Sequence, residues 1–194
     1  IKVKLLTYTP QPERVCGVAA RSCISKKTPS ELMDLPKEKL NENLDKALNK
    51  GHYSVIEHAN FTFSLEGISR ACSHQLVRHR IASYSQQSQR YVELTDSDYV
   101  KPPSILGKPQ ALKVFDETLK TINAAYKTLI KMNIPLEDAR YILPNAASTN
   151  IVVTMNAREL LHFFELRCCL HAQWEIRKIA WEMLKKVKEV APKI

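Results

Sequence analysis

Apolar side chains recur along the chain with two different periods, which separate the expected strands from the expected helices. Residues 59–65 read ANFTFSL, where Phe61, Phe63 and Leu65 alternate with polar residues. This two-residue period is typical of a half-buried strand. Residues 2–8 and 149–155 are rich in aliphatic and β-branched side chains, so we predict two further strands there.

Longer stretches show the three- to four-residue period of helices. Leu112, Phe115 and Leu119 begin an apolar stripe over residues 110–132, and Ile176, Ile179 and others form one in residues 171–190. Asn156 is a predicted N-cap for a helix that runs to residue 167. Shorter helices are predicted at residues 13–22, 29–33, 36–49 and 135–140. The 194 residues are enough for one domain with a buried core.

Three connecting regions carry more specific predictions. Residues 51–58 read GHYSVIEH, and Ser54 with Glu57 three positions later predicts a capping box on a short helix. Residues 68–80 are expected to be a helix, with Gln75, Arg78 and His79 on one face, followed by a loop. Residues 95–109 are rich in turn residues and are expected to form a surface excursion.

The segment 78–91 reads RHRIASYSQQSQRY and combines basic side chains with hydroxyl and amide groups. It contains no acidic residue, so its cations lack a partner nearby in the sequence. Arginine is suited to bidentate contacts with phosphate, which favours an anion-binding site. The alternative is ordinary: a basic run is often a solvated helix face or a helix C-terminus.

Composition narrows the functional classes. The net charge of +9 indicates an anionic partner such as a nucleotide, a phosphorylated cofactor or nucleic acid. Only 4 glycines occur, and neither GxGxxG nor a P-loop is present. The 5 cysteines form no CxxC pair, so we expect reduced thiols in a cytoplasmic protein and no metal site. No apolar run is long enough to span a membrane.

The segment 78–91 also carries a longer pattern: RHR, seven residues, then Ser, one residue and Arg-Tyr. This pattern resembles the signature of the flavin-dependent thymidylate synthases. The similarity continues in AARSC, GHYSVIEH, DARYILP and NARELLHFFELRCCLHAQWEI, in the family's order and spacing. It covers the chain from residue 19 to residue 176.

The resemblance implies an α+β fold in which long helices flank a sheet core, assembled as a homotetramer with active sites between subunits. It implies non-covalent FAD as cofactor, NADPH as reductant and methylenetetrahydrofolate as one-carbon donor. The reaction would convert dUMP to dTMP, with no nucleic acid or membrane as partner. Since the hydride would come from reduced flavin, we expect no cysteine to act as a nucleophile.

The resemblance also assigns residues to the two ligands. The matching FAD positions are Cys23, Ser54, Glu57, Arg78, His79, Arg80, Ile81, Ser85, Gln86, Asn156, His162 and His171. The matching dUMP positions are Gln75, Arg78, Gln86, Gln87, Ser88, Arg90, Arg140 and Arg167. Arg167 is also the candidate catalytic residue, because a guanidinium near the uracil can stabilise negative charge that develops on the ring.

The chain departs from the family pattern at three of these positions. Ser85 and Gln86 stand where some relatives carry Asn and Glu, and His162 replaces an Asn. Two other functional classes explain part of the sequence. A nucleic-acid-binding module would explain the charge, but aromatic residues do not interleave with the basic run. The loss of Arg90, Arg140 or Arg167 would favour an inactive flavoprotein subunit, but all three residues are present.

Overall fold

The computed structural model describes residues 1–94 and 99–194, and its centre is a four-stranded sheet. The strands are β1 (Lys2–Tyr8), β2 (Asn60–Ser69), β3 (Ala82–Gln86) and β4 (Ser148–Asn156), in the order β1-β2-β4-β3. The hydroxyls of Thr62 and Thr154 lie 2.9 Å apart, and the Gly67 amide donates to Asn150 Oδ1 at 2.9 Å. Since residue numbers rise along β2 as they fall along β4, these central strands are antiparallel.

The described chain divides into two compact units. Unit 1 comprises residues 1–65, 77–84 and 152–194, and unit 2 comprises residues 66–76 and 85–151. The division passes through β2, β3 and β4, so each of these strands contributes residues to both units. The single domain over residues 1–194 stays a prediction.

Unit 1 contains an N-terminal group of helices: α1 (Pro12–Ser22), α2 (Pro29–Met33), α3 (Lys37–Asn49) and the 3-10 helix η1 (Tyr53–His58). Val18, Leu32 and Leu40 form a buried cluster among them. Gly17 allows α1 to approach α3 closely, because a Cβ at this position would lie 2.6 Å from the carbonyl oxygen of Leu40. The packing of these helices therefore depends on the missing side chain.

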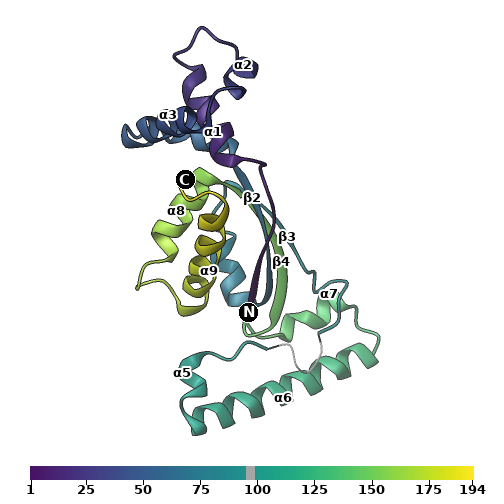
Figure 1. Ribbon diagram of the computed structural model, residues 1–194. Helices are drawn as coiled ribbons and strands as arrows, with labels where there is room; N and C mark the ends of the chain where they lie inside the picture. Colours follow the sequence, from purple (N-terminus) through teal and green to yellow (C-terminus); the bar gives the residue numbers. More distant parts are fainter. Residues whose placement is uncertain (95–98) are drawn as a thin grey trace. The chain divides into compact units, whose positions relative to one another are not determined.

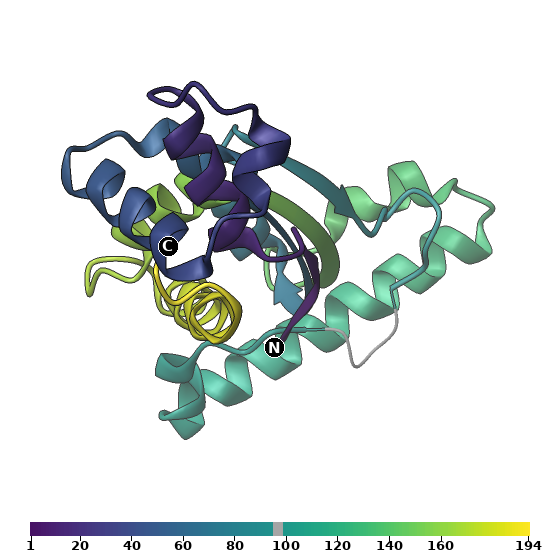
Figure 2. The same ribbon diagram turned by 45° about the horizontal axis from the view of Figure 1, so that its top comes forward.

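Two C-terminal helices of unit 1, α8 (Ala157–Arg167) and α9 (Trp174–Val190), lie side by side against the sheet (Figure 1). Figure 2 looks nearly along α9. Leu160 and Phe163 from α8, with Ile176 and Met183 from α9, are buried beneath them. This packing holds α8 in place, and α8 carries several of the predicted site residues.

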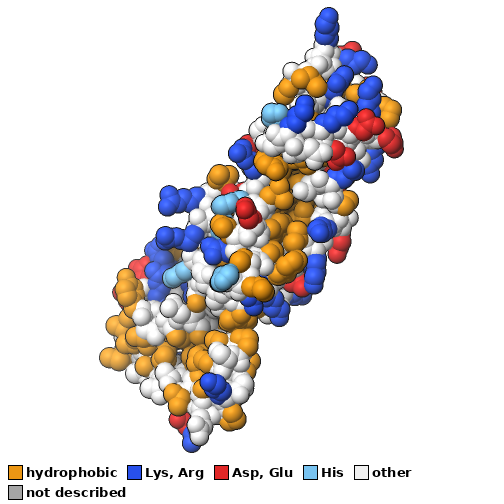
Figure 3. Space-filling view, turned by 90° about the vertical axis from the view of Figure 1, so that its left-hand side faces the viewer, with side chains coloured by type: hydrophobic (Ala, Val, Ile, Leu, Met, Phe, Trp, Pro, Cys, Tyr) orange, Lys and Arg blue, Asp and Glu red, His pale blue; other side chains and the backbone are white. Residues whose placement is uncertain are grey.

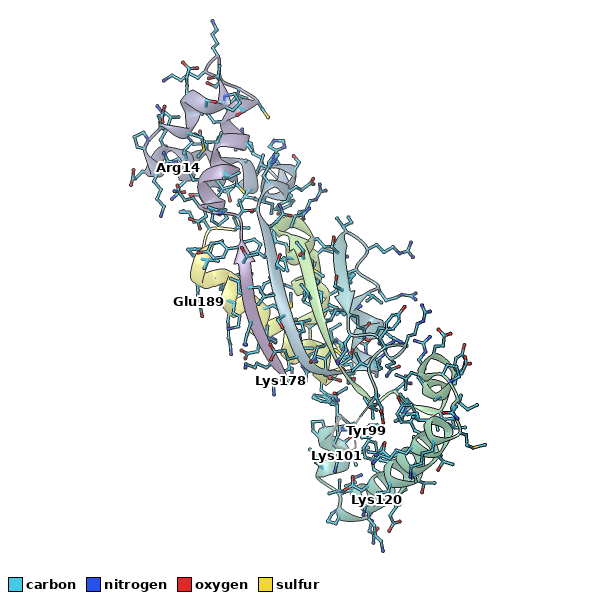
Figure 4. The ribbon with its side chains drawn as sticks, turned by 90° about the vertical axis from the view of Figure 1, so that its right-hand side faces the viewer. Arg14, Tyr99, Lys101, Lys120, Lys178 and Glu189 are labelled. Atoms are coloured by element: carbon cyan, nitrogen blue, oxygen red, sulfur yellow. The ribbon has the colours of Figure 1, made fainter. Side chains whose placement is uncertain are left out.

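Unit 2 contains α4 (Arg70–Leu76), α5 (Pro103–Leu106), the long α6 (Pro109–Lys131), α7 (Leu136–Ala139) and the 3-10 helix η2 (Arg140–Ile142). A hollow of about 670 Å³ lies along α6, and Tyr99, Lys101 and Lys120 at its edge are labelled in Figure 4. None of the predicted site residues lines it. The expected surface excursion falls partly on residues 95–98, which lie outside the described residues, and its later part contains α5.

Most predicted elements are confirmed. The strands at residues 2–8, 59–65 and 149–155 correspond to β1, β2 and β4, and Phe61, Phe63 and Leu65 are fully buried. Asn156 caps α8, since its side chain accepts a hydrogen bond from the Glu159 amide at 2.9 Å. α3 ends just before Gly51, whose φ of 77° is the left-handed conformation that favours glycine. The α+β class is therefore correct.

The expected helix over residues 68–80 is wrong at both ends. β2 continues to Ser69, and α4 covers only Arg70–Leu76. Gln75, Arg78 and His79 therefore do not share a helix face. The loop expected after Arg80 is also wrong, because residues 82–86 form β3 beside β4.

Two further local predictions need correction. Ser54 lies inside η1, whose N-cap is His52 with no side-chain cap, so the capping box with Glu57 does not form. The last helix begins at Trp174 and not at residue 171, which leaves His171 in the connection between α8 and α9. Within residues 1–94 and 99–194, no helix has the length and apolar character needed to cross a membrane. Nor do three His, Cys, Asp or Glu side chains of these residues group as metal ligands would.

Candidate active site

The predicted flavin residues fall almost entirely in unit 1. Arg78, Arg80 and Ile81 are exposed on the segment between α4 and β3, and Ile81 is 68% exposed. His79, between the two arginines, is only 5% exposed. Figure 3 shows histidine side chains in pale blue beside Lys and Arg side chains in blue and apolar side chains in orange. The RHR segment thus presents two cations to solvent and buries its histidine.

Three side chains of α8 surround His79. Arg167 Nε donates a hydrogen bond to His79 Nε2 at 3.0 Å, and Glu159 Oε1 lies 3.4 Å from His79 Nδ1. The ring of Phe163 packs edge-on at 4.9 Å between centroids. On the backbone side, the Tyr84 hydroxyl donates to the His79 carbonyl at 2.8 Å. Part of the signature segment is thereby joined to a helix that begins almost 80 residues later.

Burial and charge keep the His79 imidazole neutral. Burial lowers its pKa from 6.5 to about 4, with the positive charge of Arg167 and the neighbouring His162 acting in the same direction. Burial also raises the pKa of Glu159, while His162 opposes that shift. The ring of His162 lies 5.9 Å from that of His79. His162 is thus brought to the RHR segment although it departs from the family pattern.

Glu57 of η1 also reaches α8. Its carboxylate forms an ion pair with Arg158, and both side chains are about half exposed. Cys23 follows α1, and its thiol points to the Ala19 carbonyl at 3.7 Å. No hydrogen bond or ring contact among the described residues joins Cys23, Ser54 or His171 to His79. Direct contacts within the described residues therefore join only part of the predicted flavin set to His79.

The connection that carries His171 is held from α9. Arg177 donates to the Leu170 carbonyl at 2.7 Å, and Cys169 Sγ lies 3.5 Å from His171 Nδ1. Hydrogen bonds from the backbone and side chain of His171 lower the pKa of the exposed Cys169 thiol. Burial instead raises the pKa of Cys168, and that of Cys16 to about 12. Cys169 is the thiol most ready to ionise among those with a shifted pKa.

Unit 2 holds most of the predicted nucleotide residues, including Gln86 at the end of β3 and Gln87 directly after it. The Gln86 amide nitrogen donates to Ser73 Oγ at 3.0 Å and to Thr149 Oγ1 at 3.2 Å. Gln87 is held by Asn150, through its backbone amide at 2.8 Å and its side-chain oxygen at 3.0 Å. Both glutamines are therefore fixed against β4, and Gln86 is also fixed against α4. Gln75, half-buried on α4, and Ser85, exposed on β3, belong to the same unit.

A polar hollow of about 260 Å³ lies beside these residues, with Gln87, Ser88, Thr149 and Asn150 in its wall. Gln89 lines it as well, and its amide nitrogen is buried without a hydrogen-bond partner. A buried donor without a partner carries an energetic cost that a ligand oxygen can remove. The hollow thus offers hydrogen-bonding groups to a ligand, and Val92, Glu93 and Leu94 also line it.

Arg90 and Arg140, which lie 50 positions apart in the sequence, converge on one residue. Arg90 Nε lies 2.8 Å from the Glu137 carboxylate, and Arg140 Nε donates to the Glu137 carbonyl at 3.0 Å. Arg70 is nearby: burial lowers its pKa, and the positive charge of Arg140 adds to that effect. Three arginines and one carboxylate in this region form a site suited to an anion.

Glu159, Glu137 and Arg70 belong to these clusters, although the sequence does not assign them to a ligand. Glu159 could have been found from its spacing, since Glu159, Phe163 and Arg167 recur every four residues and so share one helix face. Glu137 lies three residues before Arg140, within reach along a helix. Arg70 gives no comparable signal, because only the end of β2 and the start of α4 bring it close to Arg140.

The model of the family described as "Thymidylate synthase complementing protein" matches residues 4–193. The chain belongs to this family. A protein from Geobacter sulfurreducens named flavin-dependent thymidylate synthase is 53% identical over 197 residues, which cover 100% of this chain and 85% of that protein. Relatives of the same name from Clostridium tetani and Saccharolobus solfataricus are 48% and 47% identical, again over 100% of this chain and over 85% and 75% of theirs.

A solved structure supports the fold of this family member. The UMP/dUMP methylase PolB from Streptomyces cacaoi, bound with 5-Br dUMP, matches with a TM-score of 0.85. The match covers 99% of this chain and 91% of that one at 23% identity. At this identity the match establishes a shared fold, to which the sheet and its flanking helices belong.

Proposed function

We propose that the protein is a flavin-dependent thymidylate synthase, which converts dUMP to dTMP in the cytoplasm. Methylenetetrahydrofolate supplies the carbon and NADPH supplies the electrons. The observation that carries the proposal is 53% identity, along the whole chain, to a protein named flavin-dependent thymidylate synthase. The clusters around His79 and Glu137 support it, because each includes residues that the resemblance assigns to a ligand: His79 and Arg167 in one, Arg90 and Arg140 in the other.

The residues of unit 1 fit a flavin cofactor. Arg78 and Arg80 are exposed, and neither makes an ion pair among the described residues, so both are available to the FAD diphosphate. The exposed Ile81 beside them offers an apolar contact to a ring. Ser54, Glu57, Asn156, His162 and His171 would complete the site, with Cys23 and Ser85 at its margin. When bound, FAD supplies hydride transfer, and the protein orients the reactants.

The residues of unit 2 would bind the nucleotide. Arg90 and Arg140 clamp the dUMP phosphate, with Gln75, Gln86, Gln87 and Ser88 contributing polar contacts. Fixing the phosphate orients the uracil, and such orientation contributes several kcal/mol as effective molarity. Arg167 belongs to unit 1, and the resemblance assigns it to the uracil, where a guanidinium stabilises the negative charge that develops on the ring.

The test is dTMP formation by purified protein supplied with dUMP, methylenetetrahydrofolate and NADPH, each omitted in turn. We expect yellow protein that releases FAD on denaturation and forms dTMP only in the complete mixture. Arg167→Ala should retain FAD and form dTMP about 100-fold to 1000-fold more slowly, as in the loss of one charge-stabilising donor. A folded wild-type protein that neither holds FAD nor forms dTMP would contradict the proposal.

We also propose a homotetramer whose subunits share each FAD. The flavin-set side chains Cys23, Ser54 and His171 are exposed and are not joined to His79 within one subunit. Flavin spectra and light scattering over a dilution series test this. FAD should be released as the assembly dissociates, and a monomer with full FAD affinity would refute it.

A further inference from the structure

One face of α8 carries a buried carboxylate that the proposed chemistry does not use. Glu159, Phe163 and Arg167 follow each other at four-residue intervals and so lie along the same face. Glu159 is 6% exposed, although it is ionisable. Its backbone is fixed by the side chain of Asn156, which caps the helix at the Glu159 amide. A buried carboxylate is costly unless it has a partner.

The partner is His79, and the hydrogen-bond inventory sets its tautomer. A guanidinium has donors and no acceptor, so the bond from Arg167 Nε requires a free lone pair on His79 Nε2. The proton of the neutral ring then lies on Nδ1. Nδ1 faces Glu159 Oε1 at 3.4 Å. The hydrogen bond to Nε2 therefore sets the tautomer, and it places the Nδ1 proton beside the Glu159 carboxylate.

The surroundings leave the ring little freedom. Phe163 packs edge-on against it, and the Tyr84 hydroxyl holds the His79 carbonyl at 2.8 Å. The ring of His162 lies 5.9 Å away between ring centroids. Burial and the charge of Arg167 lower the pKa of His79 to about 4, so the ring is neutral near pH 7.

We propose that Glu159 is a positioning residue, which acts through His79 to orient the guanidinium of Arg167. The carboxylate favours the proton on Nδ1, and the freed Nε2 then anchors Arg167 Nε. Among the described residues the Arg167 guanidinium makes no other hydrogen bond, so its terminal amino groups remain available to the uracil of dUMP. The role of these contacts in dUMP binding rests on the proposed function, whereas the contacts of His79 with Glu159 and Arg167 do not.

Without Glu159 the imidazole can place its proton on Nε2, where it would face the Arg167 donor. The guanidinium would then lose its anchor and sample several orientations. A bound uracil would have to select one of them, which costs affinity and rate. The loss should depend on Arg167 being present, and this dependence separates positioning from a general weakening of the fold.

The first experiment measures dUMP affinity and dTMP formation in two Glu159 variants. Glu159→Leu removes the acceptor and should weaken dUMP binding about tenfold. Glu159→Gln keeps an oxygen that can accept from Nδ1, so its loss should stay below about threefold. Glu165→Leu, an exposed glutamate on another face of α8, is the matched control and should leave dUMP affinity unchanged.

The second experiment combines the change with Arg167→Ala. If Glu159 acts through Arg167, adding Glu159→Leu to the Arg167→Ala variant should lower its dUMP affinity by less than about twofold. Full additivity of the two losses would overturn the proposal, because distant or merely structural effects add.

The third experiment needs no ligand. Nitrogen-15 NMR of the His79 imidazole should show Nδ1 protonated and Nε2 unprotonated at pH 7 in the wild type and in Glu159→Gln. Glu159→Leu should show a mixture. A wild-type ring protonated on Nε2 would overturn the proposal, and this holds even if Glu159→Leu fails to fold.

These outcomes separate the inference from the proposed function. If the wild type forms no dTMP but shows the expected tautomer and its dependence on Glu159, the proposed function fails and the positioning of Arg167 stands. If dTMP forms but the tautomer is the opposite one, the proposed function stands and the role of Glu159 is wrong.

Discussion

The segment 78–91 contributes residues to two clusters that differ in their physical character. In unit 1, His79 is buried against Glu159, Phe163 and Arg167, and its charge is suppressed. In unit 2, Arg90 is about half exposed and pairs with an equally exposed Glu137. Exposed ion pairs contribute little to stability because water and salt screen them. One cluster is therefore built into the core, while the other keeps its charge available for an anion.

One sequence motif can thus serve both core packing and ligand binding, because burial differs along it. A side chain in the core is held by packing, and removing it should chiefly lower the free energy of unfolding. A side chain at the surface is held loosely, and removing it should chiefly lower ligand affinity. The predictions below test this division.

The largest difference should appear between two aromatic residues. Phe163 is fully buried against His79, so Phe163→Ala should lower the free energy of unfolding by about 3–5 kcal/mol. Tyr91 is 76% exposed, and the guanidinium of Arg90 lies 5.5 Å from its ring centre. Tyr91→Ala should therefore lower the free energy of unfolding by less than about 1 kcal/mol. Urea unfolding measures both. Similar losses for the two variants would mean that burial does not distinguish the clusters.

Acid should destabilise the buried cluster through His79. Its pKa is about 4 in the folded protein against an ordinary 6.5, so between these values the unfolded chain takes up a proton that the folded protein does not. The free energy of unfolding therefore falls as the pH falls through this window, by up to about 3 kcal/mol. At pH 7 and above this penalty is absent.

The measurement compares urea unfolding of the wild type and His79→Gln at pH 7 and pH 4. Glutamine cannot titrate, and its oxygen can still accept from Arg167, so the variant should lose less stability on acidification. Glu159 has a raised pKa and acts in the opposite direction, which is why the difference between the two proteins is the readout. Equal acid sensitivity would show that His79 titrates normally.

The exposed cluster should affect binding and leave stability almost unchanged. Arg90→Ala and Arg140→Ala each remove a charge-assisted contact to phosphate, worth about 1.5–3 kcal/mol, so dUMP affinity should fall tenfold or more. FAD affinity should change less. Isothermal titration with each ligand decides this, with Lys113→Ala on the exposed face of α6 as control. Equal losses for both ligands would point to misfolding or to a wrong assignment.

The smallest effect is expected at the thiols. Cys169 is exposed and its pKa is lowered by His171, so iodoacetamide should modify it before the buried Cys16, whose pKa is raised to about 12. Cys169→Ser should nevertheless form dTMP at the wild-type rate, because no thiol is needed for hydride transfer from a flavin. A folded, FAD-bound Cys169→Ser without turnover would show that this thiol takes part in the chemistry.

Local patterns in the sequence were enough to predict much of the fold. Alternation at Phe61, Phe63 and Leu65 predicts β2, and the stripe containing Ile176, Ile179 and Met183 predicts α9, because burial of one face imposes a period on the residues themselves. Asn156 predicts the start of α8, because its side chain accepts a hydrogen bond from the Glu159 amide three residues later. Each of these signals is short in range.

The same reasoning failed where the partner lies far along the chain. The end of β2 and the whole of β3 were assigned to a helix and a loop. In the structure the Gly67 amide donates to the Asn150 side chain, and the Gln87 amide donates to the Asn150 carbonyl. Pairing with β4 decides the conformation of both segments, and nothing in their own periodicity reveals it.

For the site, residue types can be read from the sequence: cations suited to anions, and a signature that the family shares. Which of these side chains are buried, and hence which carry charge, depends on packing between distant segments. This packing places His79 between Glu159 and Arg167, and it brings Arg90 and Arg140 to Glu137. Burial and long-range contact set pKa values and hydrogen-bond roles, and both arise only when separate segments pack together.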